Sequence, residues 1–182
     1  MKVIGGDKKG KTIYAPKSRH IRITSDRIKK SLFDILPPME GMSFLDLYGG
    51  TGNVGIEALS RGAKKVVFIE RAQLHFQAIK RNLDDCGFQS GYVTIRGDVE
   101  RGVKLLEKER EKFDVIFVDP PYDRDLIKKS LYLLAVSGLL KKGGIVAVEH
   151  SVREEVFGDD LFTLSDQRRY GDTVLSFMKS TE

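Results

Sequence analysis

Four short apolar runs follow one another along the chain, and each leads to an acidic residue. In chain order these acids are Asp46, Glu70, Asp98 and Asp119. Amphipathic segments of helical period separate the runs, and alternating strands and helices indicate a parallel sheet with helices on both faces. Open sheets of this kind bind ligands at the carboxyl ends of their strands. The four acids are therefore expected around one ligand site.

The same pattern predicts an α/β domain built on a mainly parallel seven-stranded sheet whose last strand is antiparallel. Expected strands occupy residues 44–48, 65–70, 91–96, 113–118, 145–149, about 161–169 and 173–178. Expected helices occupy residues 26–36, 56–61, 74–83, 99–111 and 126–136. An N-terminal hairpin is expected from residues 2–4 and 11–15, which flank a Gly-Gly-Asp turn region.

A glycine-rich segment joins the first expected strand to the next helix. Gly50, Gly52 and Gly55 form G-x-G-x-x-G, in the strand–helix context that a nucleotide-type ligand loop requires. Glu70 lies twenty positions beyond Gly50 and suits the diol of a ribose. NAD sites share both features, so the glycine loop leaves an NAD(P)-binding oxidoreductase open as an alternative.

The fourth run ends in Asp119-Pro120-Pro121-Tyr122. Two consecutive prolines remove two N–H donors and stop the strand, which produces a stiff loop rich in acceptors. Carbonyl and carboxylate oxygens can accept from the exocyclic amino group of a base, and an aromatic ring can stack on its face. The alternative is that the prolines only end a strand and Tyr122 packs on the surface.

Electrostatics favours S-adenosylmethionine over a dinucleotide. A pyrophosphate calls for helix N-termini and positive charge, whereas S-adenosylmethionine carries a sulfonium and an ammonium that suit clustered carboxylates. Asp46, upstream of the glycines, and the Asp-Pro-Pro-Tyr loop together favour S-adenosylmethionine.

Positive charge is concentrated at the start of the chain. Residues 1–30 carry a net charge of +8, whereas the other 152 residues carry −3. This asymmetry favours a polyanion-binding segment attached to a nearly neutral body, although a solvated lysine-rich surface is the plainer alternative. The candidate RNA-binding residues are Lys8, Lys9, Lys11, Arg19, Arg22 and Arg27.

One cysteine and three scattered histidines predict neither a disulfide nor a metal site, and no membrane-spanning run is expected.

With these motifs in view, the chain resembles the bacterial 16S rRNA (guanine-N2)-methyltransferases. The resemblance covers nearly the whole chain, and its more family-specific parts are Gly5-Gly6 and Thr24-Ser25-Asp26-Arg27. Two departures are Ile23, where proline is usual, and Tyr48, where phenylalanine is usual. The resemblance implies a Rossmann-like methyltransferase domain at residues 39–182 after a basic hairpin and helix extension at residues 1–38.

The resemblance also implies roles for single residues. S-adenosylmethionine is expected to contact Asp46, Tyr48, Gly50, Gly52, Asn53, Glu70, Arg71, Asp98 and Val99. Within this set, Asp46 and the glycine loop are expected at the methionine portion, Glu70 at the ribose and Asp98 at the adenine amino group. The target base is expected at Asp119, Pro120, Pro121 and Tyr122.

The implied reaction is methylation of a guanine N2 in 16S rRNA, within an assembled or nearly assembled small subunit. A cytoplasmic monomer is expected. Ionised Asp119 favours guanine modestly, because a carboxylate can accept from both N1–H and N2–H, whereas adenine presents a donor beside an acceptor. Alternatives are a DNA or other RNA amino-methyltransferase acting on adenine N6 or cytosine N4, an NAD-binding oxidoreductase, and a non-catalytic RNA-binding factor.

Overall fold

The computed structural model describes residues 1–16, 24–121, 125–154, 156 and 161–181. Within this part of the chain a seven-stranded sheet has the order β3-β2-β1-β4-β5-β7-β6. The strands are β1 (Ser43–Asp46), β2 (Lys65–Glu70), β3 (Tyr92–Arg96), β4 (Phe113–Val118), β5 (Leu140–Ser151), β6 (Phe162–Tyr170) and β7 (Thr173–Ser180). β1 to β5 pair in parallel, and β7 is antiparallel to both β5 and β6. The predicted fold class is confirmed.

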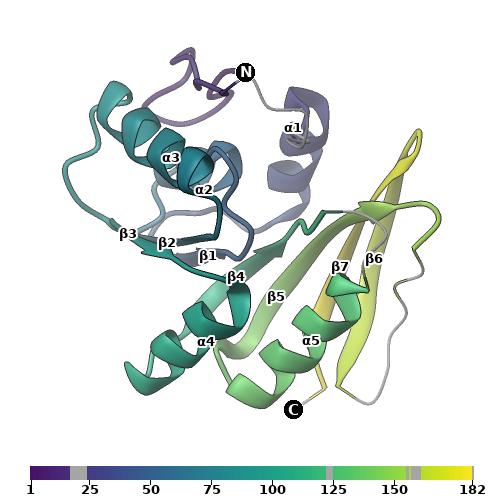
Figure 1. The fold of residues 1–182 in the computed structure, drawn as a ribbon. Coiled ribbons are helices and arrows are strands. Elements are labelled where there is room, and N and C mark those ends of the chain that lie inside the picture. The colour runs from purple at the N-terminus through teal and green to yellow at the C-terminus, as the bar shows by residue number, and fades with distance from the viewer. Residues whose placement is uncertain (17–23, 122–124, 155, 157–160, 182) are drawn as a thin grey trace.

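Helices cover both faces of the sheet, as Figure 1 shows. The helices are α1 (Asp26–Ile35), α2 (Asn53–Ser60), α3 (Gln73–Asp85), α4 (Val99–Lys108) and α5 (Leu126–Ser137). α1, α2 and α3 lie on one face together with the N-terminal segment, whereas α4 and α5 lie on the other. None of the helices among the described residues has both the length and the apolar character needed to cross a membrane.

Strand order reverses between β1 and β4. From β1 the chain moves outward through β2 to β3, then crosses back through α4 to place β4 on the other side of β1. Such a reversal leaves a crevice at the carboxyl ends of the two central strands, where ligands bind in open α/β sheets. The loops after β1 and β4 are the glycine loop and the Asp-Pro-Pro segment, so both motifs flank this crevice.

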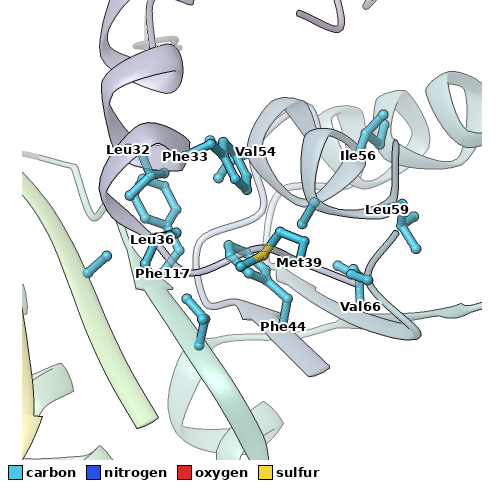
Figure 2. Packing of buried hydrophobic residues seen from close by; sticks show 14 of the residues in the cluster. Leu32, Phe33, Leu36, Met39, Phe44, Val54, Ile56, Leu59, Val66 and Phe117 are labelled. Carbon is cyan, nitrogen blue, oxygen red and sulfur yellow. The ribbon is translucent and has the colours of Figure 1, made fainter. Parts of the chain in front are cut away.

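Two apolar layers hold the helices on the sheet, and α1 belongs to the first of them. Figure 2 shows Leu32, Phe33 and Leu36 of α1 and its C-cap packed towards Phe44 of β1 and Phe117 of β4. The rings of Phe33 and Phe44 stack with their centroids 6.3 Å apart. This apolar burial fixes α1 to the two strands that border the crevice.

The first sixteen residues pair less than predicted. An isolated bridge between Lys2 and Thr12 stands where the hairpin is expected, with Val3 N donating to Lys11 O at 2.9 Å and Ile13 N to Met1 O at 3.1 Å. Val3 and Ile13 are buried in the same core layer as α1. We refer to residues 1–14 as the arm. The boundary between residues 1–38 and 39–182 stays a prediction.

Candidate active site

Asp46 ends β1 and is buried, with 2% of the residue exposed. Its Oδ2 accepts from Gly55 N of α2 at 3.1 Å. Burial raises the pKa of Asp46 to about 7; the charge of Glu70 adds to the rise and the Gly55 hydrogen bond opposes it. A cation placed beside this carboxyl would lower its pKa, because the cation stabilises the ionised form.

Glu70 ends β2 and holds the glycine loop. Its Oε2 accepts from Gly50 N at 2.8 Å, and its Oε1 accepts from Ala72 N at 2.6 Å. Gly50 and Gly52 have φ values of 53° and 80°, in the left-handed region that glycine adopts without strain. The sequence therefore produces a loop whose backbone turns sharply at two glycines and is tied to the acid at the end of the neighbouring strand.

Gly55, the third glycine of the motif, serves close packing. A Cβ at this position would lie 2.2 Å from Cε1 of Phe68, so only glycine lets α2 approach β2 this closely. The close approach brings the start of α2 against Asp46, whose Oδ2 bonds to Gly55 N. Gly50 and Gly52 therefore allow the turns of the loop, and Gly55 allows α2 to pack closely against β2.

Asn53 is the first residue of α2 and is buried. Its Oδ1 accepts from Lys29 Nζ at 2.7 Å, and its Nδ2 donates to Thr24 O at 3.0 Å. Both ends of the side-chain amide therefore bond to residues at or just before α1. The structure joins Asn53 to α1, and its predicted contact with a cofactor stays a prediction.

The third acid, Asp98, lies after β3 and caps α4. Its Oδ1 accepts from Arg101 N at 2.8 Å. Val99 begins α4 and packs against the second core layer, whereas Arg71 is exposed just after β2. Because β3 pairs with β2, Asp98 lies one strand further from the crevice than Glu70. The predicted contacts of Asp98, Val99 and Arg71 with the cofactor stay predictions.

Tyr48 follows β1 and is oriented towards α5. Its hydroxyl lies 2.8 Å from Ser130 Oγ, and its ring packs against the second core layer. Burial raises the pKa of the Tyr48 hydroxyl, and the Ser130 hydrogen bond opposes that rise. The extra hydroxyl compared with phenylalanine thus has a partner within the protein.

Asp119 follows β4, on the opposite side of β1 from Glu70. Thr24, just before α1, donates from its hydroxyl to Glu149 Oε2 at 2.9 Å, and the same hydroxyl oxygen lies 3.4 Å from Asp119 Oδ2. Pro120 is buried and Pro121 is exposed. Tyr122 lies outside the described residues.

Thr24 and Glu149 are functional candidates that the sequence analysis missed. Glu149 lies in the buried second half of β5 and is itself 0% exposed. A signal was present, since Glu149 repeats the pattern of an apolar run that leads to an acid. Thr24 belongs to the Thr-Ser-Asp-Arg segment, where its residue type suggests only a helix cap; the observed cap of α1 is Ser25.

The described RNA-binding candidates lie in two places. Lys8, Lys9 and Lys11 belong to the turn of the arm, where Lys8 Nζ lies 5.5 Å from the ring centroid of Phe88. Arg27 lies on α1, with its guanidinium carbon 5.8 Å from the ring centroid of Tyr170 in β6. Arg19 and Arg22 lie outside the described residues.

Known proteins are similar to this chain over almost its whole length. Residues 1–179 match the family model described as conserved hypothetical protein 95. A relative named "Putative rRNA methyltransferase YlbH", from Bacillus subtilis, is 35% identical, with 98% of each chain covered. Ribosomal RNA small subunit methyltransferase D of Escherichia coli is 28% identical, with 95% of this chain and 93% of the relative covered. Among solved structures, a hypothetical protein of Thermus thermophilus is 28% identical and gives a TM-score of 0.84, with 98% and 99% of the two chains covered.

Proposed function

The chain belongs to the conserved hypothetical protein 95 family, and from this premise we propose that it methylates small-subunit ribosomal RNA with S-adenosylmethionine. The proposed target atom is the exocyclic N2 of a guanine. Relatives named as ribosomal RNA small subunit methyltransferases cover nearly the whole chain, which supports an enzyme of the methyltransferase class. The family resemblance inferred from the motifs is thereby confirmed.

One observation carries the proposal: the acids at the ends of β1 and β2 are both bonded to the backbone around the glycine loop. Each oxygen of Glu70 accepts one backbone N–H, which leaves a further lone pair on each oxygen for a ribose hydroxyl. Asp46 places a buried carboxyl beside the loop, where an ammonium would stabilise its ionised form. These donor and charge patterns fit S-adenosylmethionine, which brings positive charge and no phosphate.

When bound, S-adenosylmethionine supplies a methyl group already activated by its sulfonium. The chain's own residues then have to provide proximity and alignment rather than a strong nucleophile. Glu70 ends β2 and Asp119 follows β4, so the two acids lie on opposite sides of β1. An amino group held by Asp119 would therefore lie across β1 from a ribose held by Glu70. As methyl transfer proceeds, the amino nitrogen gains positive charge and then loses one proton. A partly exposed carboxylate at Asp119 can stabilise that charge and pass the proton to solvent.

Guanine is the base that fits Asp119 best. Its N1–H and N2–H are adjacent donors, and an ionised carboxylate offers two acceptor oxygens. We therefore assign the N2 amino group to Asp119 and the Pro120 carbonyl, with Tyr122 as the stacking partner. The net charge of +8 over residues 1–30 supports an RNA-binding role for this region. We also propose that the protein acts as a cytoplasmic monomer on an assembled or nearly assembled small subunit.

Methyl transfer from labelled S-adenosylmethionine tests this function directly. Small subunits from cells that lack the protein are incubated with the wild type or with Asp119→Ala, alongside naked ribosomal RNA and DNA as substrates. Label should enter small-subunit RNA with the wild type, and most of it should be lost with Asp119→Ala. Label in DNA alone, or equal activity of the two proteins, would remove the basis for the assignment.

A further inference from the structure

Lys29 on α1 is a fully buried lysine whose ammonium has a complete set of acceptors. The side chain is 0% exposed, and Nζ donates to Lys2 O and to Asn53 Oδ1, each at 2.7 Å. Glu57 Oε2 lies 3.3 Å from the same nitrogen. An ammonium has three N–H donors, so these three acceptors account for all of them. Burial lowers the pKa of Lys29, and the nearby Glu57 carboxylate opposes that shift.

The three acceptors come from two segments of the chain. Lys2 belongs to the arm, and Asn53 and Glu57 lie on successive turns of α2. Glu57 is also fully buried; its Oε2 accepts from Ile4 N of the arm and its Oε1 from Arg61 Nε, both at 2.8 Å. Lys29 is therefore the point at which the arm, α1 and α2 are bonded together.

The contact with Asn53 reaches the cofactor loop. Asn53 directly follows Gly52, which has a φ of 80° and ends the glycine loop. A shift of Asn53 would therefore move the loop backbone that bonds to Glu70 through Gly50. Asn53 also donates to Thr24 O, and the Thr24 hydroxyl lies between Glu149 and Asp119. One continuous set of contacts thus joins the arm to both loops of the crevice.

We propose that Lys29 is a positioning residue that holds Asn53, and through it the glycine loop, in the geometry that binds the methyl donor. The assignment rests on the proposed function and goes beyond it in two respects. It gives Asn53 a positioning role in place of cofactor contact, and it makes the arm and α1 part of the support for the cofactor loop. Groups preorganised in this way bind more tightly because less ordering is needed on binding.

The test uses variants that keep the fold. Lys29→Met combined with Glu57→Gln removes both buried charges at similar volume, so that neither is left unpaired in the core. Arg61 loses its carboxylate partner in this variant, but its side chain is partly exposed to solvent. Asn53→Ser is a second variant, because serine is tolerated at a helix start but is too short to preserve the Lys29 bond. Lys30→Met is the matched control, since Lys30 is exposed and pairs with Asp34 on the surface of the same helix.

The dissociation constant of S-adenosylhomocysteine is measured by calorimetry well below each melting temperature. We expect about tenfold weaker binding in the double variant and in Asn53→Ser, with Lys30→Met unchanged. The same substitutions should raise KM for S-adenosylmethionine more than they lower kcat. A protein with all three substitutions should bind little more weakly than the double variant or Asn53→Ser, because both of these variants remove the same contact between Lys29 and Asn53.

Wild-type affinity in the folded double variant or in folded Asn53→Ser would overturn the positioning role. Fully additive losses would also overturn it, because they would indicate that Asn53 contacts the ligand independently of Lys29. The proposed function is judged separately on the wild type. If the wild-type protein fails to bind S-adenosylhomocysteine, the proposed function fails; if it binds and the variants match it, only the role of Lys29 fails.

Discussion

We expect the buried carboxyl of Asp46 to make the affinity for S-adenosylmethionine depend on pH. Its pKa of about 7 reflects, first, its removal from water. If the methyl donor binds through its cationic groups, it should favour the ionised form of Asp46. With a pKa of about 7, the ionised fraction rises about thirtyfold between pH 5.5 and pH 8. We therefore expect the affinity for S-adenosylmethionine to rise about thirtyfold over this range, or about 2 kcal/mol.

Calorimetry in buffers of different ionisation enthalpy measures both the affinity and the protons released on binding. Asp46→Asn removes the carboxyl and should flatten the pH dependence. His75→Gln is a second control, because His75 Nδ1 lies 3.9 Å from Glu70 Oε1, beside the proposed ribose site. Affinity that is flat in the wild type, or a slope that persists in Asp46→Asn, would refute the reasoning.

The same pKa shift has a consequence for the stability of the ligand-free protein. The folded-state pKa lies above the unfolded-state value, so the contribution of Asp46 to stability is fully present below about pH 4 and is lost as pH rises through about 7. Asp46→Asn should therefore gain stability relative to the wild type as pH rises towards 8. Thermal unfolding across this range measures the difference.

Three other substitutions have definite expected results. Glu70→Ala should weaken S-adenosylhomocysteine binding by about 1–3 kcal/mol, because it removes both the acceptor that anchors the glycine loop and the acceptor proposed for the ribose; unchanged calorimetric affinity would contradict this. Changing Lys8, Lys9 and Lys11 to glutamate should weaken RNA binding and flatten its dependence on salt, while the cofactor affinity stays unchanged. A salt slope equal to that of the wild type would contradict an RNA-binding role for the arm. Burial alone would raise the pKa of Asp114, but its bonds with Lys141 and Ser43 lower it to about 2. Asp114→Asn should therefore lower the free energy of unfolding by about 1–2 kcal/mol at pH 7, a difference that exists above about pH 4 and disappears as pH falls through about 2.

Local patterns in the chain were sufficient to predict the sheet and its acidic edge. Apolar runs that alternate with amphipathic segments predicted the parallel strands, and such strands place the residues after their carboxyl ends on one edge. Asp46 and Glu70 are consequently found where the pattern indicated, on either side of the glycine loop. Strand ends were less accurate: β5 begins at Leu140, five residues before the expected start, because it continues past a register shift opposite β4.

The buried polar contacts could not be predicted from sequence. Lys29 reads as one of many lysines in a basic segment, and only the packing of α1 against α2 shows that its ammonium is enclosed. Cofactor contact at Asn53 is what the family resemblance implies, whereas its amide bonds depend on residues more than twenty positions away. Contacts of this kind depend on how helices pack on the sheet, which local periodicity does not specify.

The most direct test of the central claim is nucleoside mapping of small-subunit ribosomal RNA from cells that lack the protein. We expect one guanine to lose an N2-methyl group in these cells. The wild-type gene should restore it, and a gene carrying Asp119→Ala should not. A lost methyl on adenine N6 or cytosine N4, an unchanged RNA, or full restoration by Asp119→Ala would contradict the account.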